Sequence, residues 1–158
     1  MIIIGYQGIG KSTLANEDKH YIDLESGCFW VDGKRDENWY KPYCNIAEHL
    51  SKQGYTVFVS SHEVVRKRLQ QSSELIGAVV PSLNLKDEWI KKLEYRYKYS
   101  KLEKDYKAWK NAEDRYEDNI KEIINDCKYT LTIDSIDYDL VIELLKLGSI
   151  IKNNLYVD

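Results

Sequence analysis

The sequence has few cysteines and prolines and no long apolar run. Three cysteines are spread over 158 residues without a C-x-x-C pair. An odd number of separated cysteines is typical of reduced thiols and argues against a disulfide framework. The chain opens with only four apolar residues, MIII, which are too few for a signal peptide or a membrane span. We therefore expect a cytoplasmic protein with no membrane partner.

The sequence also lacks an excess of positive charge. Its formal net charge is −3 and its isoelectric point is near 5.7, so the protein as a whole does not attract nucleic acid. A polyanion would have to bind at a local basic patch. A chain of this length can bury the core of one ordinary domain, so we expect a single domain over residues 1–158. The sequence does not indicate an oligomeric state.

Glycine is concentrated at the start of the chain, in the stretch MIIIGYQGIGKSTLA. Gly5, Gly10, Lys11 and Ser12 match the phosphate-binding pattern G-x-x-x-x-G-K-[ST] position for position. In such a turn the backbone N–H groups and the following helix N-terminus attract phosphate, the lysine reaches the β and γ phosphates, and the hydroxyl ligates Mg²⁺. We predict that ATP and Mg²⁺ bind at Gly5, Gln7, Gly8, Ile9, Gly10, Lys11, Ser12 and Thr13.

Apolar runs alternate with helical patterns along the rest of the chain. A parallel sheet needs a crossover between neighbouring strands, so this alternation predicts a doubly wound α/β fold with a five-stranded parallel sheet and helices on both faces. We expect strands at residues 1–4, 20–26, 55–61, 76–82 and 128–134. We expect helices from Lys11, at 39–53 and 62–71, two within 85–127 with a break near Tyr99, and one at 137–148 ending at Gly148.

Three local signals refine these boundaries. Ser60 with Glu63, and Ser100 with Glu103, have the spacing of a capping box and predict two helix starts. Residues 27–38 contain two glycines and a charge cluster and are expected to form a loop.

The end of the third predicted strand excludes some nucleotide-binding classes. Motor and GTPase-like proteins usually carry a Mg²⁺-binding aspartate there. This strand ends instead in Ser60, Ser61 and His62. A guanine-reading N-K-x-D motif is also missing.

In the motif GYQGIGKS and in the order of its elements, the chain resembles the P-loop kinase superfamily, in particular nucleoside and nucleoside-monophosphate kinases. The resemblance implies an ATP-dependent phosphotransferase that acts on a nucleotide, such as a deoxynucleoside monophosphate, or on a nucleoside. It also implies an acceptor-binding segment at about residues 32–52 and a helical lid at about 85–126. A small, lysine-rich kinase of this kind would suit a virus or phage that acts in the host cytoplasm.

The resemblance gives roles to charged residues. Arg96 would belong to the lid, and Arg35 or Arg66 would hold the phosphate of the acceptor, because a guanidinium binds two phosphate oxygens at once. Asp23 stands at the carboxyl end of the second predicted strand. There it would bind the acceptor hydroxyl and accept its proton, or act on Mg²⁺ through water. Lys11, Asp23, Arg96 and Arg66 are the predicted catalytic residues.

Two other functions fit the same sequence. The first is a kinase for a polynucleotide end or a modified DNA base, because residues 91–110 mix lysines with aromatic residues. Acidic residues in the same stretch make DNA the less favoured partner. The second is an ATP-binding partner protein without catalysis. The identity of the acceptor is not specified by the sequence.

Overall fold

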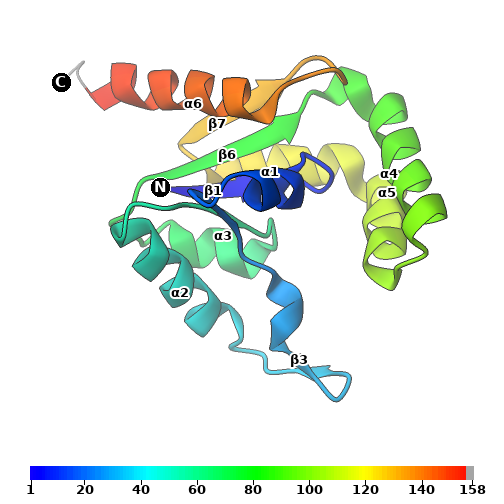
Figure 1. Ribbon diagram of the computed structural model, residues 1–158, viewed down its shortest axis with the longest axis horizontal. Helices are drawn as coiled ribbons and strands as arrows, with labels where there is room; N and C mark the ends of the chain where they lie inside the picture. The colour runs from blue at the N-terminus through cyan, green and yellow to red at the C-terminus, as the bar shows by residue number, and fades with distance from the viewer. Residues whose placement is uncertain (156–158) are drawn as a thin grey trace.

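The computed structural model describes residues 1–155 and contains a five-stranded, wholly parallel sheet. The strand order is β2-β5-β1-β6-β7, which confirms the predicted doubly wound α/β fold of the P-loop type (Figure 1). Four strands lie within the predicted segments, and β1 runs one residue beyond its segment, to Gly5. They are β1 (Ile2–Gly5), β2 (Tyr21–Asp23), β5 (Thr56–Val59), β6 (Ile76–Pro81) and β7 (Tyr129–Ile133).

Six helices within residues 1–155 cover the sheet and extend beyond it. Helices α1 and α6 pack on one face, whereas α2, α3 and the end of α5 pack on the other. Helices α4 and α5 form a hairpin that stands beside the loop between β1 and α1 (Figure 1). The helices are α1 (Lys11–Glu17), α2 (Tyr40–Lys52), α3 (Glu63–Leu69), α4 (Lys86–Ser100), α5 (Glu103–Asp126) and α6 (Leu140–Leu155).

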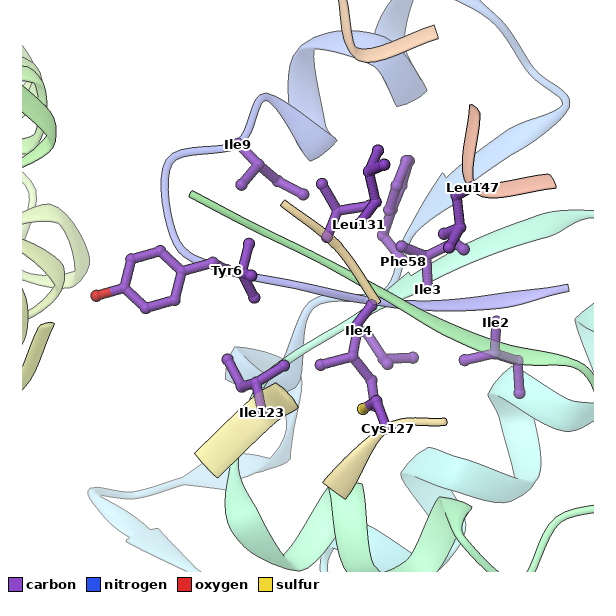
Figure 2. Close-up of a cluster of buried hydrophobic side chains, with 14 of the residues drawn as sticks. Ile2, Ile3, Ile4, Tyr6, Ile9, Phe58, Ile123, Cys127, Leu131 and Leu147 are labelled. Atoms are coloured by element: carbon purple, nitrogen blue, oxygen red, sulfur yellow. The ribbon is translucent and has the colours of Figure 1, made fainter. Parts of the chain in front are cut away.

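The core explains why the first strand is apolar at every position. Figure 2 shows Ile3 on one face of the sheet, with Phe58 and Leu147, and Ile4 on the other, with Cys127. Each of the three isoleucines of β1 is at most 1% exposed. A strand covered on both faces needs a continuous apolar run, because alternate side chains point to opposite sides. The central strand that leads into the glycine turn is therefore fixed firmly in the sheet.

The strand order places the glycine turn at the centre of one edge of the sheet. The chain goes from β1 to β2 on one side, returns through β5, and then crosses to β6 on the other side. Ligands of open α/β sheets bind outside the carboxyl ends of the strands, at the point where the chain changes direction. The loops after β1, β2, β5 and β7 meet at this edge.

The segment expected to form a loop, residues 27–38, contains short regular elements. A 3₁₀ turn, η1 (Ser26–Phe29), precedes a two-stranded antiparallel hairpin of β3 (Trp30–Val31) and β4 (Lys34–Arg35). The hairpin turn uses two residues with positive φ, Asp32 and Gly33. This geometry suits a tight hairpin, and Asp and Gly are residue types that tolerate it.

Both predicted capping boxes are wrong, although the helices exist. The N-cap of α3 is His62, and the Ser60 hydroxyl lies 2.7 Å from Nδ1 of that histidine. The break near Tyr99 is confirmed, but Ser100 ends α4 and its hydroxyl donates to Asp105. Neither serine is the N-cap of the helix that follows it: Ser60 interacts with His62, and Ser100 accepts from the backbone N–H of Leu102, which is itself the N-cap of α5.

The prediction that the last helix ends at Gly148 is also wrong, because α6 continues to Leu155. A glycine inside a helix costs about 1 kcal/mol relative to alanine. Beyond it, Ile151 packs into the core with 2% exposure. Burial of a large aliphatic side chain contributes about 2 kcal/mol and offsets that cost. Within residues 1–155, no helix has the length and apolar character needed to span a bilayer.

Candidate functional site

The glycine turn after β1 adopts a backbone that only glycine accommodates easily. Gly8 has a φ of +84° and Gly10 a φ of +95°. A Cβ at Gly5 would lie 2.7 Å from Cδ of Lys11, and one at Gly8 would lie 2.9 Å from Leu93. The turn is therefore wound closely around the stem of Lys11 and against α4. This is the backbone arrangement that a phosphate cradle requires.

The α4–α5 hairpin is attached to this turn. The indole Nε1 of Trp89 on α4 donates to the carbonyl of Gln7 at 2.9 Å, and the Gln7 side chain donates to the carbonyl of Ala108 on α5 at 2.8 Å. Trp89 is fully buried. The segment predicted to be a lid is thus held at its base to the phosphate loop. Its free end carries Ser100 and the loop to α5.

Lys11 starts α1 and turns back over the glycine turn. Its ammonium donates to the carbonyls of Gly5 at 3.2 Å and Tyr6 at 3.3 Å. Burial lowers the pKa of this ammonium, while the nearby Asp23 raises it and Arg96 lowers it. A charge with little solvent is strongly attracted to any anion that enters, so Lys11 is arranged to receive phosphate.

Asp23 ends β2 on the other side of Lys11. Burial raises the pKa of its carboxyl, and the neighbouring Glu25 raises it too, whereas Lys11 and the Ser12 hydroxyl lower it. Asp23 therefore has Lys11 and Ser12 as close neighbours. A carboxylate with a raised pKa beside a phosphate site suits proton acceptance.

These residues line a cleft of about 1020 Å³ at the carboxyl edge of the sheet. The floor contains all the residues predicted to bind ATP and Mg²⁺ in the phosphate loop, together with Asp23. One wall is formed by residues 23–26 and 60–62, after β2 and β5. The opposite end is residues 136–141, between β7 and α6. This volume is at the upper end of the roughly 300–1,000 Å³ typical of a small-molecule site.

The α4–α5 hairpin adds three cations to the cleft. Arg96 donates from Nε to Asp105 at 2.7 Å, and Lys104 lies 3.3 Å from Glu25 across the cleft. Burial lowers the pKa of the third, Lys92, and Arg96 lowers it further. Arg96 thus occupies the place that the lid prediction gave it, and a buried carboxylate already orients it.

Arg66 is not in the cleft, so its predicted role with the acceptor is not supported by its position. Its side chain is 5% exposed and donates to Asp126 at 2.7 Å and to Glu122 at 3.1 Å, both on α5. This ion pair ties α3 to α5. Arg66 is therefore part of a structural ion-pair network, and its guanidinium does not line the cleft.

Replacing Arg66 with methionine is expected to destabilise the protein by about 2 kcal/mol, because it leaves Asp126 buried with one partner fewer. The loss is smaller than that for a fully buried pair, since Lys67 still binds Asp126 at 2.6 Å. Urea denaturation measures it. Arg115→Met is the matched control, because Arg115 is exposed and binds the same Glu122. Equal midpoints for the two variants would contradict a structural role.

Arg35 lies at the rim, behind the wall. Its Nη2 donates to the carbonyl of Ser26 at 2.8 Å, and its guanidinium lies 3.3 Å from the ring centroid of Trp39. It braces the β3–β4 hairpin against α2 and does not line the cleft. The positive charge of Arg35 also affects His62, which does line the cleft. Burial lowers the pKa of His62, and Arg35 and Arg66 lower it further.

Sequence reasoning missed the end of the cleft formed by residues 136–141, and also Lys92. The Tyr138 ring stacks on Trp89 with centroids 6.0 Å apart, and the Tyr138 hydroxyl accepts from Lys92 at 3.2 Å. Nothing in the sequence marks these partners, which are 46 to 49 positions apart. The available signal was that residues 136–141 directly follow the last strand, because the loops after parallel strands lie at the same carboxyl edge of the sheet.

The residues present fit Mg²⁺ only together with a nucleotide. Within residues 1–155, no group of three histidine, cysteine, aspartate or glutamate side chains is placed to hold a metal ion. Mg²⁺ commonly binds through one or two protein groups, phosphate oxygens and water. The Ser12 hydroxyl and the Asp23 carboxylate are the groups that would meet it here.

Comparison with known proteins bears on the fold. No protein-family model matches the sequence, and no curated protein matches it. Among solved structures, the chain is similar to the tunicamycin resistance protein of Deinococcus radiodurans, with a TM-score of 0.54 and 15% sequence identity. The similarity covers 95% of this chain and 94% of that chain. At this identity the likeness shows a shared fold and no more.

Proposed function

We propose that this protein is an ATP-dependent phosphotransferase that moves the γ-phosphoryl group of ATP to a small acceptor, a nucleotide or a nucleoside. The observation that carries the proposal is that Lys11 and Asp23 line the same cleft, close enough for each charge to act on the other. A phosphate-binding lysine beside a carboxylate with a raised pKa is what phosphoryl transfer to an acceptor needs. Hydrolysis or simple binding of ATP does not require the part of the cleft that lies beyond the phosphate loop.

The proposed mechanism assigns a task to each residue. The loop amides and Lys11 hold the β and γ phosphates, and Arg96 stabilises the charge that develops on the transferring group. Asp23 orients the acceptor and takes up its proton. Mg²⁺, held at Ser12, would neutralise phosphate charge. Arg96 comes from the α4–α5 hairpin, which lines part of the cleft.

An ADP-release assay with MgATP tests the proposal. The acceptor panel contains nucleosides, ribo- and deoxynucleoside monophosphates, tunicamycin, and single-stranded and duplex DNA. We expect ADP release that depends on a monomeric acceptor and disappears in a Lys11 variant. Tight ATP binding with no release for any acceptor would instead favour the non-catalytic partner protein.

The same assay separates the small-molecule kinase from a DNA kinase. The lysines of residues 91–110 that would contact DNA are partly paired: Lys98 lies 2.6 Å from Glu94, and Lys107 lies 2.7 Å from Glu103. This pairing favours a solvated helix surface. Release only with DNA, falling steeply as salt rises, would contradict the small-molecule proposal.

A further inference from the structure

The wall of the cleft that would face the acceptor is acidic and hydroxylated. Residues 23–26 and 60–62 supply two carboxylates, Asp23 and Glu25, together with three serines and His62. Within the described chain, this wall contains no lysine or arginine. We call residues 23–26 and 60–62 the acceptor wall.

The arginines near the acceptor wall have other partners. Arg35 donates to the carbonyl of Ser26 from behind the wall. Arg66 donates to the carbonyl of Ser61 and binds Asp126 and Glu122. Arg68 lies 3.3 Å from Glu48 on α2. A phosphate monoester carries close to two negative charges and is usually bound by arginines or lysines that point at it. None of these three guanidiniums lines the cleft.

Of the three cations that the α4–α5 hairpin brings to the cleft, Lys92 donates to Tyr138 at the end opposite the acceptor wall, and the other two are matched by carboxylates. Lys104 lies 3.3 Å from Glu25, and Arg96 is bound by Asp105, which is 4% exposed. An acceptor phosphate would have to displace a carboxylate from each of them. The transferring phosphoryl group of ATP already requires Lys11 and Arg96.

The acceptor wall is also rigid. The hydroxyl of the fully buried Tyr43 donates to the carbonyl of Leu24 at 2.7 Å and accepts from the backbone N–H of Ser60 at 2.8 Å. One side chain thus joins the two halves of the wall. Binding is therefore expected to use the wall as it stands, without rearrangement that brings an arginine forward.

We propose that the acceptor is a hydroxyl compound without a phosphate group, such as a nucleoside or another neutral polyol, and that it binds to the acceptor wall through its hydroxyls. This inference rests on the proposed phosphotransferase function. The acceptor oxygen forms a bond to the γ phosphorus of ATP, and the bond to the bridging oxygen breaks with its electron pair leaving on ADP. The hydroxyl proton passes to the Asp23 carboxylate.

The need for a base also distinguishes a hydroxyl acceptor from a phosphate acceptor. A phosphate oxygen is already ionised near pH 7, since its second pKa is about 6, and needs no base. A hydroxyl does need one, and Asp23 is a carboxylate of the acceptor wall that lines the same cleft as the phosphate loop. For a phosphate acceptor the same carboxylate would only add repulsion.

Matched pairs of acceptors test the inference. Each nucleoside is compared with its 5′-monophosphate, and glucose with glucose 6-phosphate, by kcat/KM for ADP release. We expect the unphosphorylated member to be preferred at least tenfold, since like charges placed together in a cleft oppose binding. A monophosphate used equally well or better would overturn the inference, while the phosphotransferase function would stand.

A binding titration decides the case in which no acceptor of the panel reacts. The protein is first saturated with a MgATP analogue that cannot be hydrolysed. Inorganic phosphate and the monophosphates are then titrated in, and calorimetry records the heat of binding. We expect no saturable binding of these anions in the millimolar range. Saturation in the micromolar range would overturn the inference. Failure of the analogue itself to bind would refute the proposed function instead.

A charge variant gives the converse result. Glu25→Gln removes one carboxylate of the acceptor wall and frees Lys104, so we expect the preference against monophosphates to shrink about fivefold, the effect of one nearby charge in water. Glu103→Gln is the control, because Glu103 is exposed beside Lys104 and does not line the cleft. An unchanged preference in Glu25→Gln would contradict the role of the acceptor wall.

Discussion

Replacing Lys11 with methionine is expected to lower acceptor-dependent ADP release by about 10²–10³-fold, the loss seen when one preorganised donor is removed from developing charge. Methionine keeps the aliphatic stem, which is needed because the glycine turn is wound tightly around it: a Cβ at Gly5 would already lie 2.7 Å from Cδ of Lys11. The variant therefore removes the ammonium with little change in packing. The rate is measured at saturating acceptor.

The same variant is expected to be at least as stable as the parent protein. Burial lowers the pKa of Lys11, so the charged ammonium is less favourable in the folded chain than in the unfolded chain at neutral pH. A neutral side chain removes that cost, and the urea midpoint should not fall. Lys91→Met, at an exposed position of α4, is the control and should keep full activity. A lower midpoint together with lost activity would indicate a folding defect and contradict the catalytic role.

The fold was predictable because its strands are marked locally. The run MIII is followed by a glycine, and TVFV by two serines, so each buried strand has a visible end. Helix ends were less predictable, because distant contacts decide them. Gly148 looked like a stop, but Ile151 gains more from burial in the core than the glycine costs.

The site was predictable only where its residues are contiguous. The glycine turn carries its chemistry within eight positions, and Asp23 follows from its place at a strand end. Arg66 was assigned wrongly to the cleft, because its partners, Asp126 and Glu122, are about 60 positions away and leave no local signal. The hydrogen bond between Lys92 and Tyr138 escaped prediction for the same reason.

A second large effect is expected for Asp23→Asn. This variant should lower kcat by about 10²–10⁴-fold, the range for loss of a general base. Burial raises the pKa of Asp23 above that of an ordinary carboxyl, and Glu25 adds to the effect. The carboxylate must be ionised to accept a proton. The kcat/KM of the parent protein should therefore fall as pH drops through this raised pKa, and the variant should lack that acid limb.

Stability changes in the opposite direction and separates catalysis from folding. A raised pKa means that the ionised carboxylate is less favourable in the folded chain, so stability declines as pH rises through the folded-state pKa. Asparagine resembles the neutral form and is expected to raise the urea midpoint at neutral pH. Asp114→Asn serves as the control, because Asp114 is exposed on α5. Its kcat and its urea midpoint should equal those of the parent protein. If Asp23 acted on Mg²⁺ alone, the variant would need more Mg²⁺ for half-maximal rate and would keep the acid limb, which would contradict its role as the proton acceptor.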